Sequence, residues 1–169
     1  MSWIGAILLI IATSSIGFER SLRLKKRPEQ LMQIKTALQI MEAEMVYSQH
    51  AIVDVCDQIS KHIQAPLKVF FHAVATKLSE NDDLAVLWTK ELDELKFSSA
   101  LEEEELSILK QFGHTLGHFD LTQQQKQIQL TSVHLDRLLK EADQNYLMFS
   151  KVYRGIGILS GILIALILM

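Results

Sequence analysis

Residues 28–48, PEQLMQIKTALQIMEAEMVYS, decide the fold that this sequence predicts. Apolar side chains recur in them at spacings of three and four residues, which is the period of one face of an α-helix. Pro28 suits the first turn of such a helix, because the N–H that proline lacks would have no partner there. We therefore expect a helix that begins at Pro28 and buries a narrow seam, formed by Leu31, Ile34, Leu38, Met41 and Met45 and widened by Ala37 and Ile40.

Similar patterns predict five further helices. Breakers are rare in the middle of the chain, where Gly113 and Gly117 are the only glycines and are expected to share one loop. Ser99 with Glu102 resembles a capping box for the fifth helix, which should stop at Gly113. Asp120 with Gln123 is a comparable start for the sixth helix, which continues towards the C-terminus without a breaker. Asn81-Asp82-Asp83 is expected to form a turn with a cap for the fourth helix. The expected helices cover about 51–63, a segment from Pro66, a segment after the turn 81–83, 99–113, and a segment from 121 onwards.

Both ends of the chain are apolar. Residues 3–18 (WIGAILLIIATSSIGF) and 155–169 (GIGILSGILIALILM) contain no charge, although each is shorter than the ~20 residues that usually span a bilayer. A cleaved signal peptide is the alternative for the first run, but no basic residue precedes that run. We expect an all-α protein, in which a compact bundle of about six helices (20–154) is flanked by an N-terminal transmembrane helix (3–18) and a C-terminal transmembrane helix (155–169).

Lysine and arginine flank the apolar runs only on the side of the middle segment. Loops rich in lysine and arginine usually stay on the cytoplasmic side of a membrane. This distribution therefore predicts that residues 20–154 lie in the cytoplasm and both termini outside. The cluster beside the first run would also favour anionic lipid headgroups, while no basic face suits a nucleic acid. The single cysteine, Cys56, excludes an intramolecular disulfide and fits a reducing compartment. The flanking basic residues are Arg20, Arg23, Lys25, Lys26, Arg27, Lys151 and Arg154.

No group of residues meets the requirements for catalysis. His114 and His118 have the spacing of a metal pair on a helix, but the neighbouring glycines favour a solvated loop. Cys56 lies on an apolar helix face, which predicts a buried and unreactive thiol. We therefore expect a protein that is not an enzyme and has no cofactor, metal or small-molecule substrate.

Two sets of residues are candidates for binding other helices or proteins. The acidic run Glu102, Glu103, Glu104 and Glu105 lies at a helix start, where it is either a solvated first turn or a docking surface for a basic partner. Gly157 and Gly161 form a G-x-x-x-G, a spacing that allows two membrane helices to approach closely. The first apolar run or another copy of the chain would be the partner of these glycines.

The sequence resembles the stage III sporulation protein AB family of endospore-forming bacteria. The opening stretch from GFERSLRLKKRPEQ to MEAEMVYS, the segment LGHFDLTQQQKQIQL and the ending KVYRGIGILSGILIALIL carry the resemblance over nearly the full chain. Arg154-Gly155 departs from the pattern, since a leucine is expected before the glycine. The matching positions are Gly17, Glu19, Arg27, Pro28, Gln30, Leu31, Ala37, Leu38, Glu42, Glu44, Tyr47, Leu116, Gly117, Asp120, Gln125, Tyr153, Gly157 and Gly161.

The resemblance implies a platform in the channel between mother cell and forespore, related to the F-type platform proteins of type II secretion and type IV pilus machines. It implies a place in the mother-cell membrane, with a cytoplasmic bundle that couples the AA ATPase of the same operon to other stage III sporulation proteins, and it is compatible with a homo-oligomer. Arg27, Glu42 and Glu44 are its candidate partner-binding residues. The alternative is a membrane-anchored signalling adaptor or scaffold that binds a soluble regulator through the acidic stretch 80–105.

Overall fold

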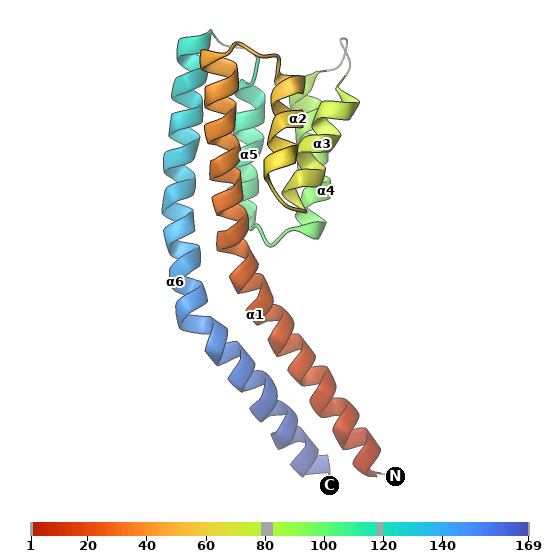
Figure 1. The fold of residues 1–169 in the computed structure, drawn as a ribbon. Helices are drawn as coiled ribbons and strands as arrows, with labels where there is room; N and C mark the ends of the chain where they lie inside the picture. The colour runs from red at the N-terminus through yellow and green to blue at the C-terminus, as the bar shows by residue number, and fades with distance from the viewer. Residues whose placement is uncertain (1, 79–82, 118–119, 169) are drawn as a thin grey trace. The chain divides into compact units, whose positions relative to one another are not determined.

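The part of the chain that the computed structural model describes consists of helices joined by short loops, which confirms the all-α expectation (Figure 1). The structure describes residues 2–78, 83–117 and 120–168, without the side chains of 2–14, 16–17, 153–154, 157–158 and 160–168. Its elements are α1 (Ser2–Met41), η1, a π-helix (Glu42–Tyr47), α2 (Ile52–His62), α3 (Leu67–Lys77), α4 (Leu84–Ser98), α5 (Glu103–Thr115) and α6 (Leu121–Leu168).

Two compact units divide the chain. Glu29–Leu139 form one, which we call the bundle unit, while Met1–Pro28 and Lys140–Met169 form the other, which we call the terminal unit. In the bundle unit, the last turns of α1 and the first turns of α6 pack beside α5, and α2, α3 and α4 complete the core (Figure 1). The expected seam is buried at Leu31, Ile34, Ala37, Leu38 and Met41, while Met45 and Ile40 are half-buried.

Side chains of α1 hold the loops of the bundle unit. Gln30 Oε1 accepts a hydrogen bond from the backbone N–H of Ala100 at 2.8 Å, and Gln33 Oε1 accepts one from Gln64 at 2.9 Å. These amides satisfy loop N–H groups that have no helical partner. Opposite α1, an aromatic cluster fills the core with edge-to-face contacts among Phe70, Phe71, Trp88 and Phe112.

The first helix does not begin at Pro28, so that prediction is wrong. α1 runs from Ser2 through Pro28 to Met41 and then continues as η1. Proline inside a helix removes one backbone hydrogen bond and crowds the preceding turn. Because the helix already extends for many turns on both sides, it tolerates that local loss without ending.

Two predictions about α5 are also wrong. The helix is capped by Glu102 rather than by Ser99, because Glu105 reaches back to the N–H of Glu102 and completes a capping box three residues later than expected. The helix also does not stop at Gly113, which is buried within α5 against Trp88. The glycine there serves close packing, whereas Gly117, with φ at +78°, serves the turn.

The other two caps follow the sequence. The Asp83 side chain accepts a hydrogen bond from the N–H of Ala85 at 2.8 Å, and Asp120 Oδ1 accepts one from Gln123 at 2.8 Å. Asn81 and Asp82, expected in the turn before α4, lie outside the described residues. α6 then continues to Leu168 without a break, as its lack of breakers predicts.

In the terminal unit, the first part of α1 and the last part of α6 run antiparallel and side by side (Figure 1). The hydroxyl of Ser21 donates a hydrogen bond to the backbone oxygen of Ser150 at 3.2 Å, and both serines are buried. Most side chains of the apolar runs 3–18 and 155–169 fall outside the described residues. Within the described residues, no helix is long and apolar enough to cross a membrane.

Candidate partner-binding site

The π-helix η1 continues α1 without a break and ends at Tyr47. Its last turn is closed by the N–H of Ser48, which donates to the oxygen of Ala43 at 3.2 Å, and by the N–H of His50, which donates to the oxygen of Glu44 at 2.9 Å. Gln49, between them, has a positive φ of 58°. Short π-helical segments are rare and often occur at functional sites, so η1 is a candidate functional site.

Two amides from α6 bind a carboxylate of η1. Gln125 Nε2 donates to Glu42 Oε1 at 2.9 Å and to Tyr47 Oη at 3.3 Å, and Gln129 Nε2 donates to the same carboxylate oxygen at 3.1 Å. Hydrogen bonds to an ionised group are the stronger kind. These hydrogen bonds join segments that are more than 75 residues apart in the sequence. We define the η1–α6 patch as Glu42, Glu44, Tyr47, Gln125 and Gln129.

The η1–α6 patch carries an exposed aromatic side chain. Tyr47 is 73% exposed although its hydroxyl is bound by Gln125. Glu44, half-buried, is hydrogen-bonded to His50, with 2.7 Å between its Oε2 and His50 Nδ1. An aromatic ring held in position at a polar surface is typical of residues that contribute most to protein–protein binding.

A groove begins at the η1–α6 patch and runs between α1 and α6. Its volume is about 390 Å³. Both apolar and polar side chains line it, so that it suits a segment of a protein that has both kinds of side chain. The lining residues are Leu38, Gln39, Glu42, Ile128, Gln129, Ser132 and Val133.

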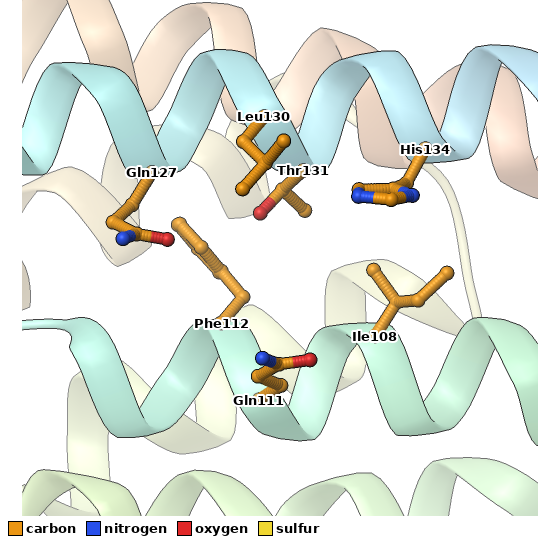
Figure 2. A pocket seen from close by; sticks show the side chains of 7 residues that line it. All are labelled: Ile108, Gln111, Phe112, Gln127, Leu130, Thr131 and His134. Atoms are coloured by element: carbon orange, nitrogen blue, oxygen red, sulfur yellow. The ribbon is translucent and has the colours of Figure 1, made fainter.

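A second hollow, between α5 and α6, is too small for a substrate. Its volume is about 110 Å³, whereas ligand pockets usually reach about 300–1,000 Å³. Figure 2 shows Phe112 of α5 reaching towards Gln127 and Leu130 of α6, while Ile108 and His134 face each other at the other end. Thr131 and Gln111 complete the lining, and no acidic side chain accompanies His134 there.

Histidine and cysteine side chains were the other candidates for chemistry. No three histidine, cysteine or acidic side chains in that part of the chain come together as metal ligands. His114 lies in the last turn of α5, and His118 lies outside the described residues. Burial raises the pKa of the Cys56 thiol to about 12, so the thiol stays protonated and unreactive near neutral pH.

The four glutamates of the acidic run do not form one surface. Glu105 is fully buried, and its carboxylate accepts a hydrogen bond from the backbone N–H of Glu102. Glu103 and Glu104 are exposed, but they form ion pairs with Lys96 and Arg137. Asp93 of the same acidic stretch pairs with Lys110 at 2.6 Å. This internal pairing weakens the case for a basic partner at 80–105.

The remaining candidates are distributed over both units. Arg27 is buried in the terminal unit, whereas Glu42 and Glu44 lie in the bundle unit. The surroundings of Gly157 and Gly161 lie outside what the structure describes, so the helix packing predicted there stays a prediction. The close contact that the structure does describe in the terminal unit, between Ser21 and Ser150, was missed.

Sequence reasoning also missed Gln129, and it used Tyr47 and Gln125 only as points of resemblance. No local signal marks these residues, because a glutamine on a helix surface is common and its partner carboxylate is 83 or 87 residues away. The best available signal was that Glu42, Tyr47 and Gln125 all belong to the resemblance, and the structure brings these three together.

The comparisons with known proteins agree with this resemblance. The pattern that defines the stage III sporulation protein AB family matches residues 2–169. The chain belongs to the stage III sporulation protein AB family. It is 34% identical over 167 residues to stage III sporulation protein AB of Bacillus subtilis (strain 168), covering 98% of each chain. A solved structure of a stage III sporulation protein AB matches with a TM-score of 0.67 and 34% identity, over 72% of this chain and 96% of the other.

Membership in the stage III sporulation protein AB family establishes a role in sporulation. The family is not a known enzyme family, and it comprises proteins of one developmental stage.

Proposed function

We propose that this protein is a non-enzymatic platform of the channel between mother cell and forespore. In that role it couples a cytoplasmic secretion-type ATPase to the membrane assembly. One observation carries the proposal: the first and last helical segments pair as a unit of their own, and the residues between them build a separate helical bundle. In such a chain, the terminal unit can anchor the protein in the membrane while the bundle unit binds a partner.

The terminal unit is the proposed membrane anchor. Both apolar runs belong to it, and each run is bordered by basic residues on the side of the middle segment. By the positive-inside rule the bundle unit then lies in the mother-cell cytoplasm. The antiparallel pairing of the two helices supports this arrangement, because it brings both basic borders to the same end of the unit (Figure 1).

The η1–α6 patch is the proposed docking surface for the ATPase. It combines an exposed aromatic side chain, two carboxylates and an adjoining groove. The hydrogen bonds from Gln125 and Gln129 hold η1 in one position, so little conformational freedom is lost when a partner binds.

Recovery of the ATPase from sporulating cells tests the docking surface. The full chain, carrying an affinity tag, should recover the stage III AA ATPase, and Tyr47→Ala should reduce the recovery at least tenfold. Phe97→Ala is the matched control, since Phe97 is also a strongly exposed aromatic side chain but lies on α4. Equal recovery with both variants would remove the patch from the proposal. Failure of the wild-type chain to recover the ATPase would contradict the coupling role.

Reporter insertions test the membrane arrangement independently. A reporter that is active only in the cytoplasm should work when inserted at Asn81, and it should be silent when fused after Met169. The opposite pattern would reverse the orientation, and activity at both sites would contradict membrane insertion of α6.

A further inference from the structure

Exposed apolar side chains gather in the terminal unit. Among the described residues, eight of the sixteen exposed large apolar side chains belong to this unit, although far fewer of its side chains are described than of the bundle unit's. A patch of this kind marks a surface that contacts a lipid or another protein. The eight are Phe18, Leu22, Leu147, Met148, Phe149, Val152, Ile156 and Leu159.

These residues form a stripe on each helix. Phe18 and Leu22 are four residues apart and share one face of α1. On α6, spacings of four, four and three residues put a second set on one face, away from the buried Ser150. That set is Met148, Val152, Ile156 and Leu159.

The contact between Ser21 and Ser150 brings the two stripes to a common level. Leu22 follows Ser21 directly, and Leu147 lies three residues, or about one turn, from Ser150. On both helices the exposed apolar surface therefore ends close to this hydrogen bond, and it extends beyond the uncharged runs of the sequence.

The two helices extend far enough beyond this level to match the thickness of a bilayer. From Ser2 to Leu22, α1 is 21 residues and about 32 Å long, and from Leu147 to Leu168, α6 is 22 residues and about 33 Å long. The hydrocarbon core of a bilayer is about 30 Å thick. The uncharged runs alone, of 16 and 15 residues, are too short for this thickness.

Basic side chains lie at the same level as the ends of the stripes. Arg20, Lys26 and Lys151 are exposed, and residues 18–28 contain five basic side chains against the single acid Glu19. Long basic side chains can lay their carbon stems along an apolar surface and extend their charge to the lipid phosphates. The exposed basic side chains thus lie next to the ends of the apolar stripes, at the level where lipid headgroups would bind.

We propose that the terminal unit binds anionic phospholipids around the Ser21–Ser150 level. The apolar stripes contact the acyl chains, while Arg20, Lys26 and Lys151 bind the headgroup phosphates. The inner boundary of the hydrocarbon core then lies near Leu22 and Leu147 instead of at the ends of the uncharged runs. Arg20 and Lys151 lie up to about one turn inside this boundary, and their long side chains extend back to the phosphates. This inference rests on the membrane anchoring proposed above and adds to it a lipid class and a depth.

Lipid association tests the charge requirement. The full chain is reconstituted in phosphatidylcholine vesicles, and the association of spin-labelled phosphatidylglycerol with the protein is compared with that of spin-labelled phosphatidylcholine. We expect at least a fivefold preference for phosphatidylglycerol, since a single basic group near the surface already supplies about that factor. Arg20→Gln with Lys26→Gln and Lys151→Gln should abolish it. The matched control changes three exposed lysines of the bundle unit to glutamine and should retain it: Lys68, Lys90 and Lys126.

A depth measurement tests the boundary. Spin labels attached at Leu22→Cys and Leu147→Cys should collide with oxygen and be shielded from a water-soluble nickel complex, whereas a label at Lys140→Cys should behave in the opposite way. Cys56 is buried and is replaced by alanine in these variants.

The outcomes separate this inference from the proposed function. If the chain inserts into vesicles but prefers neither lipid, or keeps its preference in the triple variant, the lipid inference is wrong and the anchoring stands. If the label at Leu22 contacts the nickel complex, the proposed depth is wrong. If the chain does not resist alkaline extraction from vesicles, both proposals fail.

Discussion

Trp88 occupies the space that a side chain at Gly113 would need. A Cβ atom added to Gly113 would lie 2.1 Å from Cδ1 of Trp88, and the indole is held there by a hydrogen bond of 2.9 Å from its Nε1 to the backbone oxygen of Leu109. Phe70, Phe71 and Phe112 contact the ring edge-to-face, and Trp88 is only 1% exposed, so a movement of the indole would disturb the packing of the core. The close approach of α4 and α5 depends on this glycine.

Gly113→Ala should therefore destabilise the bundle unit. Overpacking a filled core costs about 1–3 kcal/mol, and the better helix propensity of alanine offsets up to about 1 kcal/mol of that cost. Urea unfolding followed by circular dichroism measures the net loss. Gly155→Ala is the control, because nothing lies within 4 Å of its new methyl group, and it should be neutral or stabilising. Equal stability of the two variants would contradict the packing argument.

Cys56 should make the stability of the bundle unit fall at alkaline pH. Burial raises the pKa of its thiol from 9.0 to about 12, so the folded state keeps a proton that the unfolded state loses. The free energy of unfolding should then decrease between pH 9 and pH 12, by up to ~1.4 kcal/mol for each pH unit, and be unaffected by this thiol below pH 9. Cys56→Ala should be less stable at neutral pH but lack this alkaline slope.

Removal of Lys77 should cost more than removal of Lys110. Lys77 Nζ lies 2.7 Å from Glu91, whose side chain is only 5% exposed, whereas Lys110 pairs with the exposed carboxylate of Asp93. Lys77→Met leaves a buried charge with less compensation, which we expect to cost about 1–3 kcal/mol. Lys110→Met breaks a surface pair and should cost less than about 1 kcal/mol. Equal losses in thermal or urea unfolding would contradict the role of burial.

Glu105 and Glu103 should respond differently to truncation, although both belong to the acidic run. Glu105→Ala removes the side chain that closes the capping box on the N–H of Glu102, so we expect a loss of about 0.5–2 kcal/mol. Glu103→Ala removes only an exposed pair with Lys96 and should change stability by less than about 0.5 kcal/mol. Urea midpoints of the two variants provide the comparison, and a larger loss for Glu103→Ala would refute the cap.

The bonds between Glu42 and Gln125 should couple η1 to α6. Each single change, Glu42→Ala and Gln125→Ala, should destabilise the bundle unit, and the double variant should lose less than the sum by about 0.5–1.5 kcal/mol. Amide hydrogen exchange in η1 should accelerate in all three variants. Additive losses would show that the hydrogen bond contributes no coupling.

The helices themselves were predictable from the sequence, because the interactions that determine them are local. Apolar spacing identified the buried seam of Leu31, Ile34 and Leu38, and the capping roles of Asp83 and Asp120 followed from side chains that bond to N–H groups two or three residues away. The resemblance to the stage III sporulation protein AB family, confirmed by the comparisons, was likewise present in the order of motifs along the chain.

Only the tertiary structure decided which helical residues meet. Gly113 looked like a helix end until the helix packing brought Trp88 against it, and Glu105 looked solvated until the core covered it. The bond between Glu42 and Gln125 joins side chains 83 positions apart. Helix propensity and capping depend on neighbours within about four residues, whereas these contacts depend on how whole helices pack, which no local pattern encodes.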